Sequence, residues 1–363
     1  MKQILLSLAC GTIALTACTS QEVIDESIEQ GNVIGFENAV DKSTRADDPN
    51  LGVVLNKSNF DNFYVFGYYT KDGMDNTAVQ IFNTEEVKLV NGKWSYTNPR
   101  YWNPGCTYFF YAYSCGDLKL SNSWGTFSMD MTGTTTETRA LVINNYLCDY
   151  RHQHDLVYAS NEGIVGKEKP QNGNTTANKP VTFTFRHLLS QISASFTSQF
   201  PSGYQIRISN VKMANMMNIA NYNPRATVAW YNQQKQDLPN GASPYIDLAI
   251  DKTNNKNQTE TGKAAVTSGI GFVIPYNYAD AANTNVALTF DMDVIRDGKV
   301  VLQRNLRGNF NPNWESGKIY NYNIVISGTD ADLEAIAFET SADPISGWES
   351  GNGSTITLET YTK

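Results

Sequence analysis

The chain has 363 residues, of which 41% are hydrophobic, so it has enough apolar material for two cores of ordinary size. Its formal net charge is −8 and no Lys/Arg cluster stands out, which argues against nucleic acid as a partner. Aromatic residues make up 12% of the chain and long helical patterns are absent, so the composition favours β-structure.

The chain begins with a segment typical of an export signal. Lys2 is followed by an apolar run at 4–9 and by Leu-Thr-Ala-Cys at 15–18. One positive charge, a short apolar core and small residues before a cut are the anatomy of a secretory signal, and the run is too short to span a membrane. The ending resembles a bacterial lipobox, which implies removal of residues 1–17 and lipidation of Cys18. An ordinary signal peptide with an incidental cysteine is the alternative.

A short strand and an Arg–Ala bond follow the signal. In residues 32–45, Ile34 and Phe36 alternate with other residues, which predicts a strand with both side chains on one face. The bond between Arg45 and Ala46 suggests that this strand packs first and is cut away later. Its departure would open a hydrophobic groove that a strand of another chain could fill. Alternatively, Ile34 and Phe36 are permanent core residues of an uncut strand.

Strand signals are dense between residues 46 and 170. Aromatic residues dominate 63–69 and 107–114, and 155–159 is a short apolar strand. Residues 87–96 are expected to form a hairpin, because the Asn-Gly pair at 91–92 suits the two left-handed positions of a type I′ turn.

The stretch 161–180 is rich in Gly, Pro, Asn and Lys, which is a linker composition and predicts a domain boundary near residue 170. Alternating or apolar strands follow at 181–185, 192–196, 204–208, 270–275, 286–294, 300–302 and 319–326, with an Asp-Gly turn at 297–298. The pattern predicts two tandem β-sandwiches. After the signal at 1–17 we expect a lipidated tether with a removable first strand at 18–45, an N-terminal sandwich at 46–170 and a C-terminal sandwich at 171–363.

The tail, about residues 328–363, ends in an alternating strand that contains Ile356 and Leu358 and follows a Gly/Asn spacer at 351–353. A short terminal strand behind a flexible spacer is a candidate for donation to a neighbouring subunit. A last strand folded into its own sheet is the equally weighted alternative.

Three cysteines, Cys106, Cys115 and Cys148, lie beyond the signal segment and Cys18. Cys106 and Cys115 flank one apolar strand, whose ends are too far apart for a disulfide. Their expected role is packing, and their spacing suits no metal.

Signals for chemistry are weak. His152 and His154 could lie on one face and ligate a metal, but no third ligand is assignable and a polar turn is the favoured interpretation. His187 is expected to be structural. A Gly-rich phosphate loop and a nucleophile elbow are both missing, so we predict no catalysis, no metal and no cofactor. Trp124 and Trp230 could stack on sugars in a surface glycan-binding lipoprotein, although a role as core or loop anchors is favoured.

Taken in order, these pieces resemble the fimbrillin-like lipoproteins that build the protease-assembled (type V) pili of Bacteroidales-type Gram-negative bacteria. The matching pieces lie at 15–18, 34–36, 43–46, 63–67, 94–96, 101–102, 108–113, 155–159, 183–189, 314–320 and 347–348.

The resemblance implies two transthyretin-like β-sandwiches and a subunit that reaches the outer membrane with lipid on Cys18. An Arg-specific protease would cut after Arg45 and release the first strand. A strand from another subunit would then fill the groove left by Ile34 and Phe36, with Ile356 and Leu358 as the donated side chains.

The implied partners are other pilus subunits, the processing protease and, through the lipid, the outer membrane. The mature protein would stand in an extracellular fimbrium that supports adhesion. Stalk and tip roles both fit, whereas an anchor would keep its first strand, so Arg45 argues against that role. Arg-Ala pairs also occur at 139–140 and 225–226, and the position behind the first strand is what favours Arg45.

Overall fold

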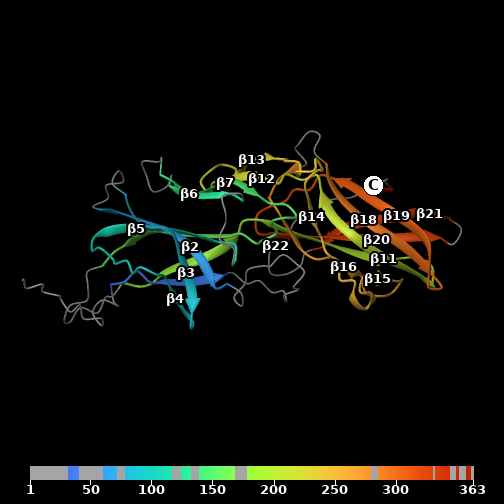
Figure 1. Ribbon diagram of the computed structural model, residues 1–363, viewed down its shortest axis with the longest axis horizontal. Coiled ribbons are helices and arrows are strands. Elements are labelled where there is room, and N and C mark those ends of the chain that lie inside the picture. The colour runs from blue at the N-terminus through green and yellow to red at the C-terminus, as the bar shows by residue number, and fades with distance from the viewer. Residues whose placement is uncertain are drawn as a thin grey trace, which may run out of the picture.

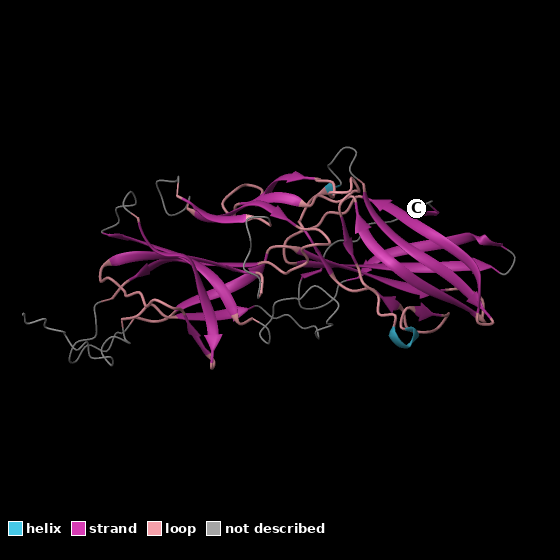
Figure 2. Cartoon of the chain, viewed as in Figure 1, coloured by secondary structure: helices cyan, strands magenta, loops and turns pink. Residues whose placement is uncertain are grey.

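The computed structural model describes residues 32–40, 60–71, 78–116, 124–131, 139–167, 178–278, 285–329, 332–343, 349–350 and 357–360. Cys18, Arg45, Ala46 and Ile356 lie outside these ranges, as does the signal segment. The molecule is elongated, with its earlier strands gathered at one end and its later strands at the other (Figure 1). Almost all of its regular structure is strand, so the predicted all-β class is confirmed (Figure 2). Within the described ranges, no helix is long and apolar enough to cross a membrane.

A seven-stranded sheet forms the N-terminal end. Its strands in spatial order are β1 (Phe36–Val40), β9 (Val181–His187), β8 (Val157–Val165), β5 (Cys106–Ser114), β2 (Asn62–Lys71), β3 (Val79–Val90) and β4 (Lys93–Ser95). β1 pairs parallel with β9, and the other neighbours pair antiparallel. The two outer strands, β1 and β4, also contact each other, so the sheet curls until its edges meet.

The curled sheet has an apolar layer on each face. Phe63 and Val65 of β2 point to a cluster inside the curl, the inner core, whereas Tyr64 and Phe66 point to a cluster on the outer face, the middle core. Burial on both faces explains why the sequence of β2 is continuously aromatic and apolar instead of alternating.

A four-stranded sheet covers the outer face. It consists of β13 (Trp230–Gln234), β12 (Ile219–Tyr222), β7 (Ala140–Leu147) and β6 (Thr126–Asp130). The middle core lies between this sheet and the seven-stranded one, and includes Tyr146, Tyr222 and Trp230.

Strand pairing crosses the boundary predicted near residue 170. β9, expected to open the second region, pairs with β8, and β12 pairs with β7, so both belong to sheets built mainly from the N-terminal half. The predicted boundary itself lies outside the described residues, and linker composition carries no information about which sheet the next strand joins.

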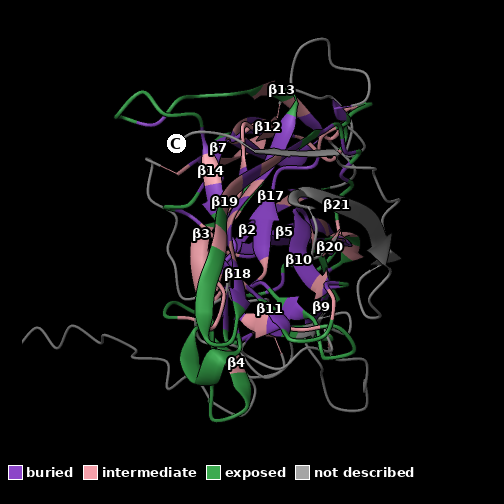
Figure 3. Cartoon of the chain, turned by 90° about the vertical axis from the view of Figure 1, so that its right-hand side faces the viewer, coloured by how far each residue is buried: buried purple, intermediate pink, exposed green. Residues whose placement is uncertain are grey.

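Two six-stranded sheets form the C-terminal sandwich. The first contains β16 (Val266–Thr267), β10 (Ser190–Ser198), β20 (Lys318–Thr329), β21 (Asp332–Asp343), β17 (Gly271–Val273) and β22 (Glu349–Ser350). The second contains β14 (Tyr245–Asp247), β11 (Tyr204–Ala214), β18 (Val286–Arg296), β19 (Lys299–Phe310), β23 (Thr357–Thr360) and β15 (Gln258–Thr259). A short 3-10 helix, η2, spans Thr253–Asn255. The core between the sheets includes Phe196, Phe290 and Tyr322, and the interior strands are buried along most of their length (Figure 3).

Both predicted tight hairpins are present. Asn91 and Gly92 join β3 to β4 with φ values of 51° and 76°, and Asp297 and Gly298 join β18 to β19 with φ values of 52° and 71°. Positive φ at both turn positions is the requirement that selects Asn-Gly and Asp-Gly.

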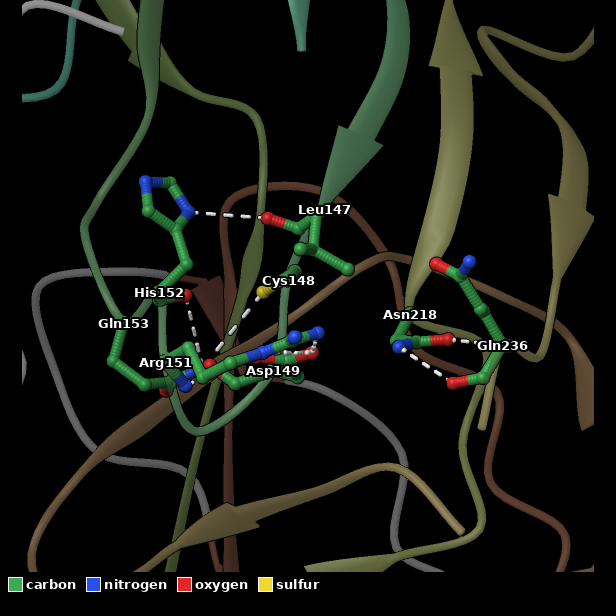
Figure 4. Close-up of polar contacts among 8 residues, drawn as sticks. All are labelled: Leu147, Cys148, Asp149, Arg151, His152, Gln153, Asn218 and Gln236. Atoms are coloured by element: carbon green, nitrogen blue, oxygen red, sulfur yellow. Dashed lines mark hydrogen bonds and ion pairs between the residues drawn. The ribbon is translucent and has the colours of Figure 1, made fainter. Parts of the chain in front are cut away.

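The loop between β7 and β8 ties the two ends of the molecule together. Gln153 accepts a hydrogen bond from the Phe272 amide at 2.7 Å and donates one to the Phe272 carbonyl at 3.2 Å, so its side chain imitates a strand partner for β17. The amide of Tyr150 donates to the Tyr245 carbonyl at 2.8 Å. Within the loop, Arg151 pairs with the Asp149 carboxylate and Gln153 donates to the Asp149 carbonyl at 3.1 Å (Figure 4).

The three described cysteines are thiols that form no disulfide, and all three are buried. Cys106 and Cys115 stand at opposite ends of β5, as expected, and both pack in cores. Burial raises the pKa of the Cys115 and Cys148 thiols well above the ordinary value, so neither is poised for thiolate chemistry.

Candidate functional site

The first strand lies at one edge of the seven-stranded sheet with its apolar face turned into the inner core. Ile34 and Phe36 are 0% and 5% exposed, whereas Glu37, the next residue of β1, is exposed. This is the alternation that the sequence predicted for the two residues.

Main-chain contacts hold the segment from two sides. On one side β1 runs parallel to β9, and the Val181 amide donates to the Gly35 carbonyl at 2.8 Å. On the other side the Ile34 amide donates to the Arg100 carbonyl at 2.8 Å, and the Trp102 amide donates to the Asn32 carbonyl at 2.9 Å. The segment therefore fills a slot between β9 and residues 100–102.

Side chains fix the same segment from the rim. The Tyr96 hydroxyl donates to the Ile34 carbonyl at 2.8 Å and accepts from the Arg100 amide at 3.1 Å. Burial raises the pKa of Tyr96 above its ordinary value, so the phenol remains a hydrogen-bond donor over the physiological pH range.

Phe36 is the apolar centre of the slot. Its ring contacts five aromatic rings, with centroid separations of 5.5–6.0 Å, contributed by Phe63, Phe82, Tyr96, Phe110 and Phe183. Four of these rings come from β2, β3, β5 and β9 and Tyr96 comes from the loop after β4, so a single side chain from β1 packs against rings from much of the curled sheet.

The burial of Ile34 and Phe36 indicates how much free energy holds the first strand in the slot. Full burial of Ile34 and Phe36 contributes about 3–6 kcal/mol, at about 1.5–3 kcal/mol for each large apolar side chain. Without the segment, the rings around Phe36 would face an open groove, and an uncovered apolar groove of this kind favours a new strand in the same place.

The last strand lies at the opposite end of the molecule. β23 is an edge strand that pairs antiparallel with β19 of the same chain, with Leu358 opposite Gly308. The described C-terminal strand is therefore folded into its own sheet, which is one of the two arrangements that the sequence left open. Leu358 is placed by its backbone alone, and Ile356 lies outside the described residues.

The other two Arg-Ala bonds lie in restrained positions. Arg139 is 3% exposed and precedes the first residue of β7. Arg225 pairs with Glu162, and the Ala226 amide donates to the Asn223 carbonyl at 3.1 Å within a tight turn. The burial of Arg139 and the tight turn at Arg225 restrict the access that a protease needs at these two bonds.

The histidine pair predicted as a weak metal candidate lies in the β7–β8 loop. His152 is fully buried, and its Nδ1 lies 3.0 Å from the Leu147 carbonyl (Figure 4). Its ring centroid is 4.1 Å from that of Trp124. Burial, reinforced by His154, lowers the pKa of His152 to about 4, so the imidazole is neutral at pH 7. No cluster of three or more His, Cys, Asp or Glu residues that could hold a metal is found in the part of the chain that the structure describes.

His187 and Trp230 have structural roles. His187 pairs with the buried Asp155 at 2.8 Å, and Trp230 is 3% exposed with its indole N–H donated to the Leu188 carbonyl at 2.9 Å. The favoured interpretation of Trp230 as a core anchor is confirmed. Tyr96, Arg100 and Phe183, which surround the first strand, were not assigned to it from sequence, because these contacts join residues between 60 and 150 positions apart along the chain.

Comparison with known families identifies the class. A family model described as fimbrillin-like matches residues 44–344, which is most of the chain. The chain therefore belongs to the fimbrillin-like family. Membership supports a role as a fimbrial subunit at the cell surface and argues against an enzyme. None of the curated proteins compared with this chain matches it.

Several solved structures are similar in fold. One is a candidate cell adhesion protein from Bacteroides uniformis, with 14% identity, 86% of this chain and 97% of that chain covered, and a TM-score of 0.43. Another, from Bacteroides ovatus, has 14% identity, coverage of 87% and 97%, and a TM-score of 0.44. The fimbrial anchor protein Mfa2 from Porphyromonas gingivalis has 13% identity, coverage of 88% and 99%, and a TM-score of 0.35. At such low scores these similarities carry no conclusion about function.

Proposed function

We propose that this chain is a structural pilus subunit that is exported as a lipoprotein, cut after Arg45 and polymerised by strand exchange. The observation that carries the proposal is the first strand. It occupies a sheet edge, fills an aromatic slot with Ile34 and Phe36, and lies only a few residues before the Arg–Ala bond.

The covalent link controls assembly in this scheme. While the bond at Arg45 is intact, the chain's own strand is present at the slot at a high effective concentration and excludes a competitor. After cleavage, the strand is held only by the non-covalent contacts described above. A strand from another subunit can then displace it and cover the same rings.

The donor in this proposal is the C-terminal end of a neighbouring subunit. Ile356 and Leu358 are two residues apart, as are Ile34 and Phe36, so the same alternate spacing of apolar side chains is available. Among the described strands β23 pairs with β19, and release from an edge breaks one ladder of hydrogen bonds.

Lipid on Cys18 would hold the precursor at the outer membrane until cleavage separates it from the mature chain. The partners of the mature chain are then other pilus subunits, and the finished fimbrium is extracellular and supports adhesion. A tip adhesin of the same pilus is the alternative role, since it needs the slot but does not extend the fibre.

Limited digestion of the precursor from residue 18 onward by an Arg-specific protease tests the proposal. We expect one early cut that gives Ala46 as the new N-terminus, followed by a ladder of oligomers in a denaturant-free gel. A cut at Arg45 that yields only monomers favours the tip role. Early cutting elsewhere, with the bond at Arg45 intact, contradicts the proposal.

A further inference from the structure

A pocket of about 480 Å³ opens between the four-stranded sheet and the C-terminal sandwich. Residues from three segments line it: 228–233 around the start of β13, 275–277 after β17, and 313–316 before β20. Its volume lies in the range of small-molecule sites, about 300–1,000 Å³. We propose that this pocket binds a neutral saccharide.

Aromatic carbon forms part of the lining. Trp230 and Trp314 direct their indole N–H groups away into the core, to the Leu188 carbonyl at 2.9 Å and to the Tyr322 hydroxyl at 2.8 Å. Both indoles are buried, at 3% and 2% exposed, so they form an apolar floor beneath the pocket and direct no donor into it. Tyr276 adds a partly exposed ring, and surfaces of this kind pack against the apolar C–H face of a pyranose.

Exposed polar side chains surround the aromatic residues. Asn277, Asn313 and Ser316 supply amide and hydroxyl groups that can donate and accept, which suits the neighbouring hydroxyls of a sugar ring. Glu315 is the charged residue of the lining, and its carboxylate pairs with Lys318 at 3.3 Å. Because the lining itself supplies no cation for an anionic ligand, the expected sugar is neutral.

In two of the three lining segments, 275–277 and 313–316, the backbone pairs across the pocket wall and leaves little for a peptide strand. The Tyr278 amide donates to the Pro312 carbonyl at 2.9 Å, and the Trp314 amide donates to the Tyr276 carbonyl at 3.0 Å, on either side of a bridge between Asn277 and Asn313. A peptide that adds to a sheet needs unpaired edge groups, whereas a sugar is recognised by side chains. The pairing therefore favours a saccharide over a peptide.

The side chain of Gln233 holds two walls of the pocket together, so the pocket is formed before a ligand binds. Its side-chain amide donates to the Trp230 carbonyl at 2.9 Å and to the Pro275 carbonyl at 3.3 Å, and so joins the wall from β13 to the wall that follows β17. A ligand that enters this pocket does not have to order its walls, which lowers the entropic cost of binding. The site is separate from the slot of the first strand and does not depend on cleavage.

Saturation-transfer NMR on the same precursor tests the proposal. The probes are methyl glycosides of galactose, mannose and N-acetylglucosamine, with methyl glucuronide as the anionic comparison. We expect transfer to at least one neutral glycoside, with an affinity of about 1 mM as is common for a single-ring ligand of few contacts, and weaker transfer to the glucuronide.

Two variants and a control locate the binding. Val228 is 63% exposed, so Val228→Trp fills the pocket entrance without removing core packing, and Tyr276→Ala removes an aromatic wall. Each is expected to weaken binding by about tenfold or more, a loss of about 1.4 kcal/mol. Tyr150→Ala, which removes a 42% exposed tyrosine outside the pocket, should bind as the parent does.

Three results would overturn the proposal. The first is the absence of saturation transfer from the parent protein to any of the neutral glycosides. The second is equal saturation transfer to the glycosides from the Val228→Trp and Tyr150→Ala variants. The third is a parent protein that binds peptides of a tryptic casein digest but no glycoside, with the peptide binding lost in Val228→Trp. The occupant of the pocket would then be a peptide.

Discussion

Phe36 of β1 stacks on Phe183 of β9, with ring centroids 5.9 Å apart and planes 12° from parallel. The two residues are separated by most of the N-terminal half of the chain, yet they pack together because β1 and β9 run parallel as neighbours in one sheet. This contact joins the first described strand to a strand that the sequence had placed in the other half of the molecule. It makes the stability of the N-terminal sheet depend on a strand that we propose to be removable.

Replacing Phe36 tests how much the slot depends on one ring. Phe36→Ala should lower the free energy of unfolding by about 3–5 kcal/mol, the range for a large aromatic residue removed from a packed core. Urea denaturation of the uncut precursor measures it. Glu37→Ala, the exposed neighbour on the same strand, should change stability by less than about 0.5 kcal/mol. Equal losses in the two variants would mean that the ring does not support the fold.

Replacing Arg45 tests the role of cleavage. Arg45→Ala should leave a lipidated, monomeric precursor, because the first strand remains linked to the chain and keeps the slot occupied. Gel filtration and N-terminal sequencing after protease treatment measure the outcome. Arg225→Lys, which removes a restrained Arg–Ala bond but keeps the charge opposite Glu162, should be processed and should polymerise as the parent does. Fibres formed by Arg45→Ala would exclude the cleavage model.

Removing the tail tests the donor strand. A chain that lacks residues 352–363 should fold, because β23 adds to the outer edge of β19 and no other described strand is paired to it. The truncated subunit should accept a strand but fail to extend a fibre. Circular dichroism measures folding, and addition of truncated subunits to growing fibres measures extension. Fibres of normal length made only of truncated chains would place the donor strand elsewhere.

His152 predicts a pH dependence of stability. Its pKa is lowered from 6.5 to about 4 in the folded chain, so between these values the unfolded chain binds the proton more readily. Stability should therefore fall as the pH drops from about 6.5 to 4, with His152 contributing up to about 3 kcal/mol at about 1.4 kcal/mol for each pH unit.

The comparison of His152→Asn with the parent isolates this contribution. The variant lacks the titrating group, so its urea midpoint should depend less on pH between 7 and 4, whatever its stability at pH 7. The same pH dependence in both proteins would mean that another group accounts for the acid response.

The local features of this protein could be predicted from short stretches of its sequence. Alternation at Ile34 and Phe36 identified a one-faced strand, and the Asn-Gly and Asp-Gly pairs identified two hairpins, because side-chain direction and positive φ are decided within a few residues. The all-β class and the resemblance to fimbrillins also followed from patterns along the chain, and the family match agrees with them.

Which strands lie side by side could not be predicted in this way and is known from the folded structure. The pairing of β1 and β9, the return of β12 and β13 to the N-terminal sheets, and the five rings around Phe36 join segments far apart in sequence. The pocket between the two ends of the molecule is likewise assembled from three distant segments. A strand's own residues determine which of its faces is apolar. Which strand lies beside it depends on how all the apolar faces of the chain pack together, so no short stretch of sequence predicts that neighbour.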